Sequence, residues 1–180
     1  MTNVARPSLI LDTAPEMINP DAFDPSTLIR DYGDIAGEVA ACRCEAALFD
    51  FSFISSAGLS GPGLVAALAA ITERTVDNHE PGRIRYALRH GQAGFIESDL
   101  TLWNSGARTL VMSGRKRDLL DLADLAAADC EFESFADKAA IFAVQGPNSL
   151  DVFDGLTNRA SLAALPYFGF STFNWVASAA

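Results

Sequence analysis

The amino-acid sequence predicts an α+β fold in which a mostly antiparallel sheet carries its helices on one face. Two observations lead to this prediction. Extended segments rich in strand-forming residues recur along the chain, and two segments between them place apolar residues three and four positions apart, as in a helix that buries one side. Because the strands are joined partly by hairpin turns and partly by these helices, we expect both helices to cover the same face of the sheet.

The N-terminal part is predicted to be a lead-in to the domain. Prolines, which interrupt helices, recur through its first 25 residues: Pro7, Pro15, Pro20 and Pro25. We therefore expect a Pro-rich, partly disordered lead-in over residues 1–34 and a single domain over residues 35–180. One or two short helices, broken at Gly33 and Gly37, are expected before Cys44.

The other elements follow from local patterns. Residues 45–54 alternate in the manner of one strand, and residues 63–72 form an Ala- and Leu-rich segment with helical spacing. Polar residues 75–82 are expected to form a loop. The remaining predicted elements are a short strand ending near residue 59, strands at 108–112, 130–134 and 139–144, a turn at 113–115, and helices at 117–128 and 149–156.

The hairpin over residues 86–103 is the segment most suited to chemistry. Gly91 and Gly94 supply a turn with little steric restriction, and residues 95–103 resume an extended pattern. Alternation places five side chains on one face: Phe95, Glu97, Asp99, Thr101 and Trp103. Two carboxylates are thus expected to share a face with aromatic rings, either as an ordinary solvated surface or as a slot for a flat ligand.

Composition excludes several functional classes. Hydrophobic residues make up 49% of the chain and charged residues 20%, and no apolar run approaches the ~20 residues that cross a bilayer. The first 16 residues lack the pattern of a secretory signal, so we expect a cytoplasmic protein without membrane contact. A net charge of −10 argues against a general nucleic-acid binder.

The charge is unevenly distributed. Residues 83–117 contain seven basic and two acidic residues, a net charge of +5, whereas the rest of the chain contains six basic and 21 acidic residues, a net charge of −15. The hairpin therefore belongs to the one basic region of an acidic chain. That region would suit an anionic small molecule, and ordinary surface charge explains it equally well.

Neither cysteine nor histidine indicates a metal site. Cys42 and Cys44 form a C-x-C pair that is too sparse for zinc without added histidines, and Cys130 stands apart, so reduced thiols are expected. His79 and His90 lie in polar, loop-like sequence and are expected on the surface.

Six motifs follow one another in an order and spacing typical of a known family. They are FDFSF at 49–53, SGPG at 60–63, GFIESDLTLW at 94–103, LVMSGRKRDLLDL at 110–122, AVQGPNSL at 143–150 and LPYFGF at 165–170. In this arrangement the chain resembles the first domain of the glycine-cleavage T-protein (aminomethyltransferase) family. The form IESDLT at 96–101 is more similar to the folate domains of dimethylglycine and sarcosine dehydrogenases.

The resemblance implies a tetrahydrofolate site at the hairpin. In such proteins the folate N5 takes up a methylene unit from an aminomethyl or iminium donor, and N10 closes the ring to give 5,10-methylenetetrahydrofolate. Asp99 matches the catalytic hairpin Asp near those nitrogens, and Glu97 adds a second carboxylate. Tyr86 matches the pocket aromatic, and Ser113 stands where the family has an Asn. From its charge rather than from the motif, Arg115 is expected to meet the glutamate tail of folate.

Departures from the family leave the function open. Ser98 replaces the first of two paired Asp residues, and Phe53 and Ile54 replace a His-Met pair. Family members are considerably longer, and the second part that completes their folate pocket is not in this chain.

Three hypotheses therefore stand. In the first, the chain is a folate-binding one-carbon transfer domain that is whole only with a partner subunit or as a fragment of a longer chain. Its expected protein partner is a lipoyl carrier or an oxidase or dehydrogenase subunit. In the second, it is a non-catalytic interaction subunit of a sarcosine-oxidase-like complex. In the third, it is related to folate-binding iron–sulfur maintenance proteins, whose Lys-Gly-Cys-x-x-Gly-Gln motif is absent here. The aromatic tail at 167–175 is also expected to self-associate.

Overall fold

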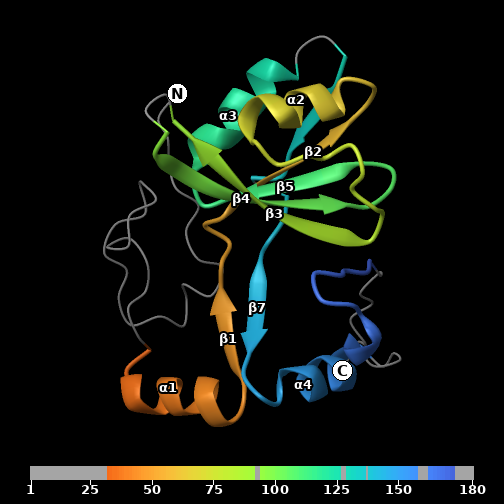
Figure 1. Cartoon of the computed structure of the whole chain (residues 1–180). Helices are drawn as coiled ribbons and strands as arrows, with labels where there is room; N and C mark the ends of the chain where they lie inside the picture. Colours follow the sequence, from red (N-terminus) through yellow and green to blue (C-terminus); the bar gives the residue numbers. More distant parts are fainter. Residues whose placement is uncertain (1–31, 92–93, 127–128, 137, 158–161, 173–180) are drawn as a thin grey trace.

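A computed structural model describes residues 32–172, apart from short gaps at 92–93, 127–128, 137 and 158–161. The predicted lead-in over residues 1–34 lies almost wholly outside the described residues, as does the end of the aromatic tail. Two helices cover one face of a five-stranded sheet, and a two-stranded ribbon extends from the other side toward two further helices (Figure 1).

The five-stranded sheet is antiparallel throughout, and its strands lie in the order β3-β4-β5-β2-β6. The two covering helices, α2 and α3, pack against each other, and α3 also contacts β2 and β5. This arrangement confirms the predicted fold class. The bounds are β2 Ser55–Ser60, α2 Leu64–Ile71, β3 Arg83–His90, β4 Ile96–Asn104, β5 Thr109–Ser113, α3 Lys116–Leu125 and β6 Glu131–Ser134.

The hydrophobic core lies between the sheet and these two helices. Alternate residues of the strands point toward the helices, as the period of two requires, and the helices contribute one apolar side each. Burying a side chain of this size stabilises the fold by about 1.5–3 kcal/mol. The largest apolar side chains that are wholly buried are Leu59, Leu68, Leu100, Leu102, Val111 and Leu122.

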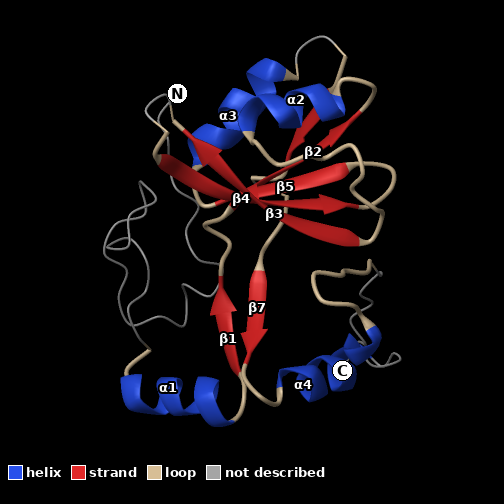
Figure 2. Ribbon diagram, in the orientation of Figure 1, coloured by secondary structure: helices blue, strands red, loops and turns tan. Residues whose placement is uncertain are grey.

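The ribbon and its helices form a second, less buried part (Figure 2). Strand β1 (Ala47–Asp50) pairs with β7 (Phe142–Gln145), and helices α1 (Ile35–Cys44) and α4 (Ser149–Thr157) lie at its far end. Helix α1 has no buried residue. A two-stranded ribbon is marginally stable by itself, so this part depends on further contacts.

The segment predicted as one strand at 45–54 is divided in the structure. Strand β1 ends at Asp50, and β2, in the other sheet, begins at Ser55. A tight turn separates them, because the Ser52 amide donates to Asp50 Oδ1 at 2.8 Å and the Ile54 amide donates to the Phe51 carbonyl at 2.9 Å. Alternation persists on both sides of such a turn, which is why the sequence pattern alone shows a single strand.

Gly37 lies within a helix, although the sequence predicts a break there. Asp34 precedes α1 as its N-cap and accepts a hydrogen bond from the Gly37 amide at 2.9 Å. A Cβ atom on residue 37 would lie 2.2 Å from Asp34 Oδ2. The glycine therefore makes room for the capping carboxylate.

The outer edge of β3 is partly covered by the C-terminal segment. Arg83 forms an antiparallel bridge with Gly169, and the Ile84 amide donates to the Phe168 carbonyl at 2.7 Å. The Phe170 ring then packs edge-on against Trp103, with 5.4 Å between the ring centroids. Within the part of the chain that the structure describes, no helix has the length and apolarity needed to cross a membrane.

Candidate functional site

The β3–β4 hairpin presents two different faces. Ala87 pairs with Leu100, and both are buried under the helices. The flanking pairs, Leu88 with Asp99 and Tyr86 with Thr101, point to the opposite side, which we call the open face of the sheet. Asp99 is exposed there.

A β-bulge changes the position of Glu97. Arg89 pairs with Ser98 and His90 pairs with Ile96, so Glu97 is an extra residue without a partner in β3. Its carboxylate turns toward Arg89 and α3, away from Asp99. The prediction that Glu97 and Asp99 share a face is therefore wrong, because simple alternation does not hold across a bulge.

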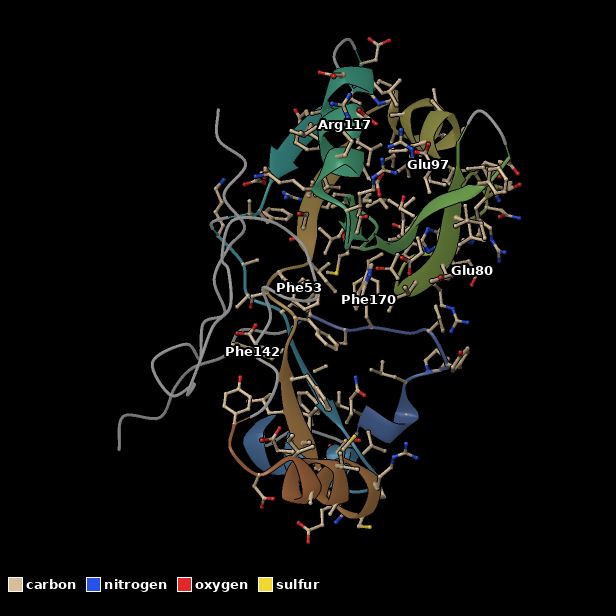
Figure 3. All side chains as sticks on the ribbon, turned by 90° about the vertical axis from the view of Figure 1, so that its left-hand side faces the viewer. Phe53, Glu80, Glu97, Arg117, Phe142 and Phe170 are labelled. Atoms are coloured by element: carbon tan, nitrogen blue, oxygen red, sulfur yellow. The ribbon has the colours of Figure 1, made fainter. Side chains whose placement is uncertain are left out.

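The open face combines apolar side chains with one carboxylate. Tyr86 is 47% exposed on this face. Trp103 donates from Nε1 to Thr101 Oγ1 at 2.9 Å, and Met112 of β5 pairs with Thr101. Figure 3 shows Phe53 and Phe170 at the level between the five-stranded sheet and the ribbon. Flat rings and an exposed carboxylate thus occur on the same side of the sheet.

Tyr86 and Asp99 are diagonal neighbours on β3 and β4. Desolvation of the phenol, together with a hydrogen bond to Asp99 and the negative charge of that carboxylate, raises the pKa of Tyr86 above its ordinary value. The Tyr86 hydroxyl is protonated at neutral pH, as in any tyrosine, and it can donate a hydrogen bond to the Asp99 carboxylate. The structure places these two predicted site residues together.

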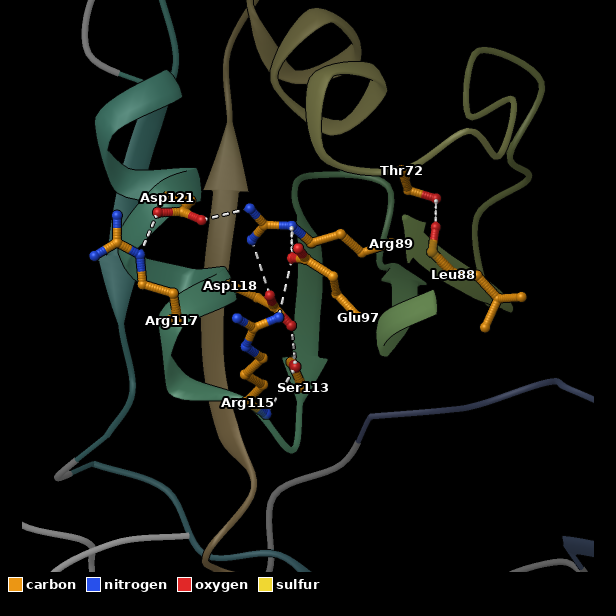
Figure 4. A network of polar contacts seen from close by, with 9 residues as sticks. All are labelled: Thr72, Leu88, Arg89, Glu97, Ser113, Arg115, Arg117, Asp118 and Asp121. Carbon is orange, nitrogen blue, oxygen red and sulfur yellow. Dashed lines mark hydrogen bonds and ion pairs between the residues drawn. The ribbon is translucent and has the colours of Figure 1, made fainter. Parts of the chain in front are cut away.

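On the helix side, Arg89 is the centre of a polar network (Figure 4). Its Nη1 lies 2.9 Å from Asp118 Oδ1, its Nη2 lies 2.6 Å from Asp121 Oδ2, and its Nε lies 3.7 Å from Glu97 Oε2. The Asp118 side chain is completely buried. A buried carboxylate requires charge compensation, and Arg89 supplies it.

Ser113 and Arg115 complete this network. The Ser113 hydroxyl donates to Asp118 Oδ2 at 2.6 Å and accepts a hydrogen bond from the Arg115 amide at 3.0 Å. The Arg115 guanidinium donates from Nη1 to Glu97 Oε2 at 3.0 Å. The structure therefore divides the predicted site residues into two groups: Tyr86 and Asp99 on the open face, and Glu97, Ser113 and Arg115 in the network.

The network also affects titration. Burial of Arg89 opposes its charge, but hydrogen bonds to Asp121 and Asp118 outweigh that effect, so the pKa of Arg89 is raised. The hydrogen bond from Arg89 is the main cause that lowers the pKa of Asp121, and the charges of Arg89 and Arg117 contribute further. These ion pairs therefore favour the charged forms of both partners.

The sequence pattern does not identify Arg89 and Asp118 as residues that support the site. The signal for Asp118 is weak but present: it stands four residues before the buried Leu122, so it occupies a position in the apolar stripe of α3. A carboxylate at such a position requires a cationic partner, and the sequence does not show which of seven nearby basic residues supplies it.

The basic segment is largely neutralised by contacts within the protein. Arg108 pairs with Glu133 at 2.9 Å, and Arg117 pairs with Asp121 at 2.7 Å. Arg85 donates to the carbonyl of Asn78 and to its side chain. Together with Arg89 and Arg115, four of the seven basic residues are paired with carboxylates in the described part of the chain, and Arg85 is held by uncharged groups, so ordinary structural charge accounts for most of the local excess.

His79 is buried, although the sequence predicts a surface position. Its Nε2 lies 2.9 Å from the Arg83 carbonyl, and its own carbonyl accepts a hydrogen bond from Asn104. Desolvation lowers the pKa of His79. Among the described residues, no group of three or more His, Cys, Asp or Glu side chains is placed to hold a metal ion.

Comparison with known proteins assigns the family. The sequence profile described as "GCVT N-terminal domain" matches residues 12–179. The aminomethyltransferase of Bacillus subtilis is 29% identical over 143 residues, which cover 77% of this chain and 39% of the relative. The aminomethyltransferase of Saccharopolyspora erythraea is 30% identical over 145 residues, covering 78% and 39%.

A solved structure shows the same fold. The glycine cleavage system aminomethyltransferase T from Bartonella henselae aligns with a TM-score of 0.65 and 22% identity, over 74% of this chain and 37% of that one. The chain thus spans well under half the length of the relatives that it matches. Its matched residues nevertheless include nearly the whole sequence, and the chain belongs to the GCVT N-terminal domain family.

Proposed function

We propose that this chain is a tetrahydrofolate-binding domain for one-carbon transfer, with the open face as its binding surface and Asp99 as its catalytic carboxylate. The observation that carries the proposal is the position of Asp99: exposed, next to Tyr86, and on a face that also carries Trp103. Membership in a family whose relatives are aminomethyltransferases supports the same reaction class.

The side chains of the open face fit a reduced folate. A pteridine ring is flat and largely apolar on its faces, and Tyr86, Trp103 and Met112 offer flat or adaptable apolar contacts. When bound, tetrahydrofolate supplies N5 and N10, the atoms between which a methylene unit is held. Asp99 would hold a proton near these nitrogens or stabilise positive charge on them, and Tyr86 would orient the carboxylate through its hydroxyl.

The remaining predicted folate contacts are Arg115, Ser113 and Glu97. The Arg115 side chain is 44% exposed, and it is proposed to meet the glutamate tail of folate while still paired with Glu97. Ser113 is buried and occupied by Asp118 and the Arg115 amide. Direct contacts of Ser113 and Glu97 with folate stay predictions. In the structure, Ser113 donates to Asp118 of α3, and Glu97 pairs with Arg115 and Arg89.

The methylene donor is proposed to come from a protein partner. The relatives have more than half of their length outside the matched region. A lipoyl carrier, as donor in glycine cleavage, fits the names of these relatives. An oxidase or dehydrogenase subunit that acts on methylated amines would fit the IESDLT motif. The similarity of this motif to the folate domains of dimethylglycine and sarcosine dehydrogenases stays a prediction. In either case the product would be 5,10-methylenetetrahydrofolate.

A second function, that of a non-catalytic interaction subunit, is favoured by the ribbon and α1. These elements expose large apolar side chains that a stable monomer would normally cover: Ile35 (62% exposed), Val39 (54%), Leu48 (55%) and Phe142 (44%). An interaction subunit would bind its partner through these exposed apolar side chains, and it would need no carboxylate on the open face.

Calorimetric titration with 5-formyltetrahydrofolate, a stable reduced folate, separates the two functions. The catalytic proposal expects micromolar binding to the chain, at least about tenfold weaker in Asp99→Ala, because a charged hydrogen-bonding group is worth about 1.5–3 kcal/mol. Asp124→Ala, which removes an exposed carboxylate of α3, is the matched control and is expected to bind as the wild type does. Equal binding by Asp99→Ala, or none by the wild type, would contradict the catalytic proposal.

A further inference from the structure

The indole of Trp103 is turned toward Asp99 along β4. Thr101 and Trp103 stand two residues apart on the open face, which is about 6–7 Å along an antiparallel strand. Trp103 donates from Nε1 to Thr101 Oγ1 at 2.9 Å, so this edge of the ring reaches back to the level of Thr101. Asp99 is the next residue of the same face beyond Thr101. The ring edge therefore lies closer to Asp99 than the backbone of Trp103 does.

Phe170 contacts the same indole from the other side. The Phe170 amide donates to the Gly82 carbonyl at 3.0 Å, and the Gly82 amide donates to the Asn104 carbonyl at 2.7 Å. Phe170 is therefore level with the end of β4 that lies away from the hairpin turn. Its ring meets the indole of Trp103 edge-on, with 5.4 Å between the centroids and 62° between the planes. The indole is thus held between Thr101 and Phe170.

The segment that carries Phe170 is itself anchored to the sheet. Gly169 forms a bridge with Arg83, and the Phe168 carbonyl accepts a hydrogen bond from the Ile84 amide at 2.7 Å. Phe168 has a φ of +57°, in the left-handed region that a bulky side chain rarely adopts. Such a conformation persists only where the surrounding structure holds it. Backbone pairing with β3 therefore determines where the Phe170 ring lies.

The held indole keeps a surface for a ligand. Trp103 and Phe170 are both partly exposed. The one polar hydrogen of the indole is already donated to Thr101, so the ring offers apolar surface without an unpaired donor. A flat ring of a ligand suits such a surface. In tetrahydrofolate N5 and N10 adjoin rings, so a ring next to these nitrogens would meet the indole when the nitrogens lie near Asp99.

We propose that Thr101 and Phe170 are positioning residues, which hold the indole of Trp103 as a wall of the folate site against a ring next to N5 and N10. The proposal rests on the proposed function for its ligand. Its structural part, the held position of the indole, is measurable without any ligand. If the two contacts served only to pack the edge of the sheet, their loss would lower stability and leave the affinity for folate unchanged.

Hydrogen exchange of the indole N–H tests the structural part. The chain has two tryptophans, so a Trp175→Phe background leaves Trp103 as the single indole signal in the NMR spectrum. Thr101→Val keeps the shape of the side chain and removes the acceptor, and the N–H is expected to exchange about threefold to tenfold faster, the range that one hydrogen bond supports. Thr101→Ser keeps the hydroxyl and should retain most of the protection. An unchanged exchange rate in Thr101→Val would overturn the proposal.

Folate titration in the same background tests the functional part. Thr101→Val and Phe170→Leu are each expected to bind 5-formyltetrahydrofolate about threefold to tenfold more weakly, because each removes one of the two contacts that hold the indole. Thr101→Ser should retain most of the affinity. Tyr167→Leu, at an 86%-exposed position of the same segment, is the matched control and should bind as the background protein does.

The two measurements together separate this inference from the proposed function. Undiminished affinity in a Thr101→Val protein whose indole exchanges faster would overturn the positioning role, although the folate proposal would stand. A background protein that fails to bind folate, together with faster exchange in Thr101→Val, would refute the folate proposal and still support the held position of the indole.

Discussion

Tyr86 and Asp99 are diagonal neighbours on adjacent antiparallel strands, and the negative charge of Asp99 contributes to the raised pKa of Tyr86 on the open face of the sheet. Diagonal neighbours of this kind lie within reach of an aromatic side chain. Both side chains are exposed, whereas the residues that follow them in the chain, Ala87 and Leu100, point to the other face and are buried. The hairpin therefore exposes the Asp99 carboxylate on one face, while its other face is occupied by the core.

Replacing the carboxylate tests its chemical role. Asp99→Asn preserves the shape of the side chain and removes its charge, so we expect normal folding and a loss of at least about 10²-fold in folate-dependent aminomethyl or formaldehyde transfer, the usual scale for losing a general base. The measurement is single-turnover transfer to tetrahydrofolate. Asp124→Asn, at an exposed site on α3, serves as the control. Unchanged transfer by Asp99→Asn would exclude Asp99 from catalysis.

The sequence predicts those features of the fold that depend on local pattern. Alternating residues and a glycine turn predict the β3–β4 hairpin, and apolar spacing predicts α2 and α3, because in each case the signal and the structure cover the same few residues. The split of 45–54 into β1 and β2 was not predicted, since alternation continues on both sides of the turn at Asp50.

The candidate site was only partly predictable for a similar reason. Asp99 and Tyr86 can be identified from the motif, and the hairpin register brings them together. Glu97 lies in a bulge of β4, where its carboxylate pairs with Arg89 of β3 and with Arg115, which precedes α3. Long-range pairing of this kind leaves no periodic signal, so alternation assigned Glu97 to the wrong face.

The core between sheet and helices should be sensitive to cavities. Leu122 of α3 is completely buried, and Leu122→Ala is expected to lower the free energy of unfolding by about 2–5 kcal/mol, from lost burial and from the cavity left behind. Leu120→Ala, at a position 47% exposed on the same helix, should cost less than about 1 kcal/mol. Urea denaturation followed by circular dichroism measures both, and equal losses would contradict the assigned orientation of α3.

Two glycines with positive φ should respond differently to alanine. Gly146, after β7, has φ +130°, and a Cβ there would lie 2.4 Å from the Glu45 carbonyl oxygen, so both the backbone and a rigid neighbour oppose a side chain. Gly94, in the hairpin turn, has φ +78° and no atom within 4 Å of a Cβ. Gly94→Ala should cost about 1 kcal/mol from backbone strain, and Gly146→Ala at least about 2 kcal/mol more. Thermal unfolding of the two variants provides the comparison; similar melting temperatures would contradict it.

The network around Arg89 should make the protein sensitive to acid. The hydrogen bond from Arg89 lowers the pKa of Asp121 in the folded state, so the unfolded chain binds a proton more readily at this carboxylate. The stabilisation is fully present above the ordinary Asp value of about 4 and is lost as the pH falls through that value toward the lower, folded one. Stability should therefore decline over this range.

Asp121→Asn should remove this contribution. The variant is expected to be less stable than the wild type at pH 7, because Arg89 and Arg117 lose a charged partner, and the difference between the two should narrow as the pH falls below about 4. Urea midpoints measured from pH 7 to pH 3 give the comparison. Asp124→Asn, which removes an exposed carboxylate of the same helix, should follow the wild-type pH dependence. A constant difference between Asp121→Asn and the wild type across the whole range would show that the ion pair with Arg89 contributes nothing to acid stability.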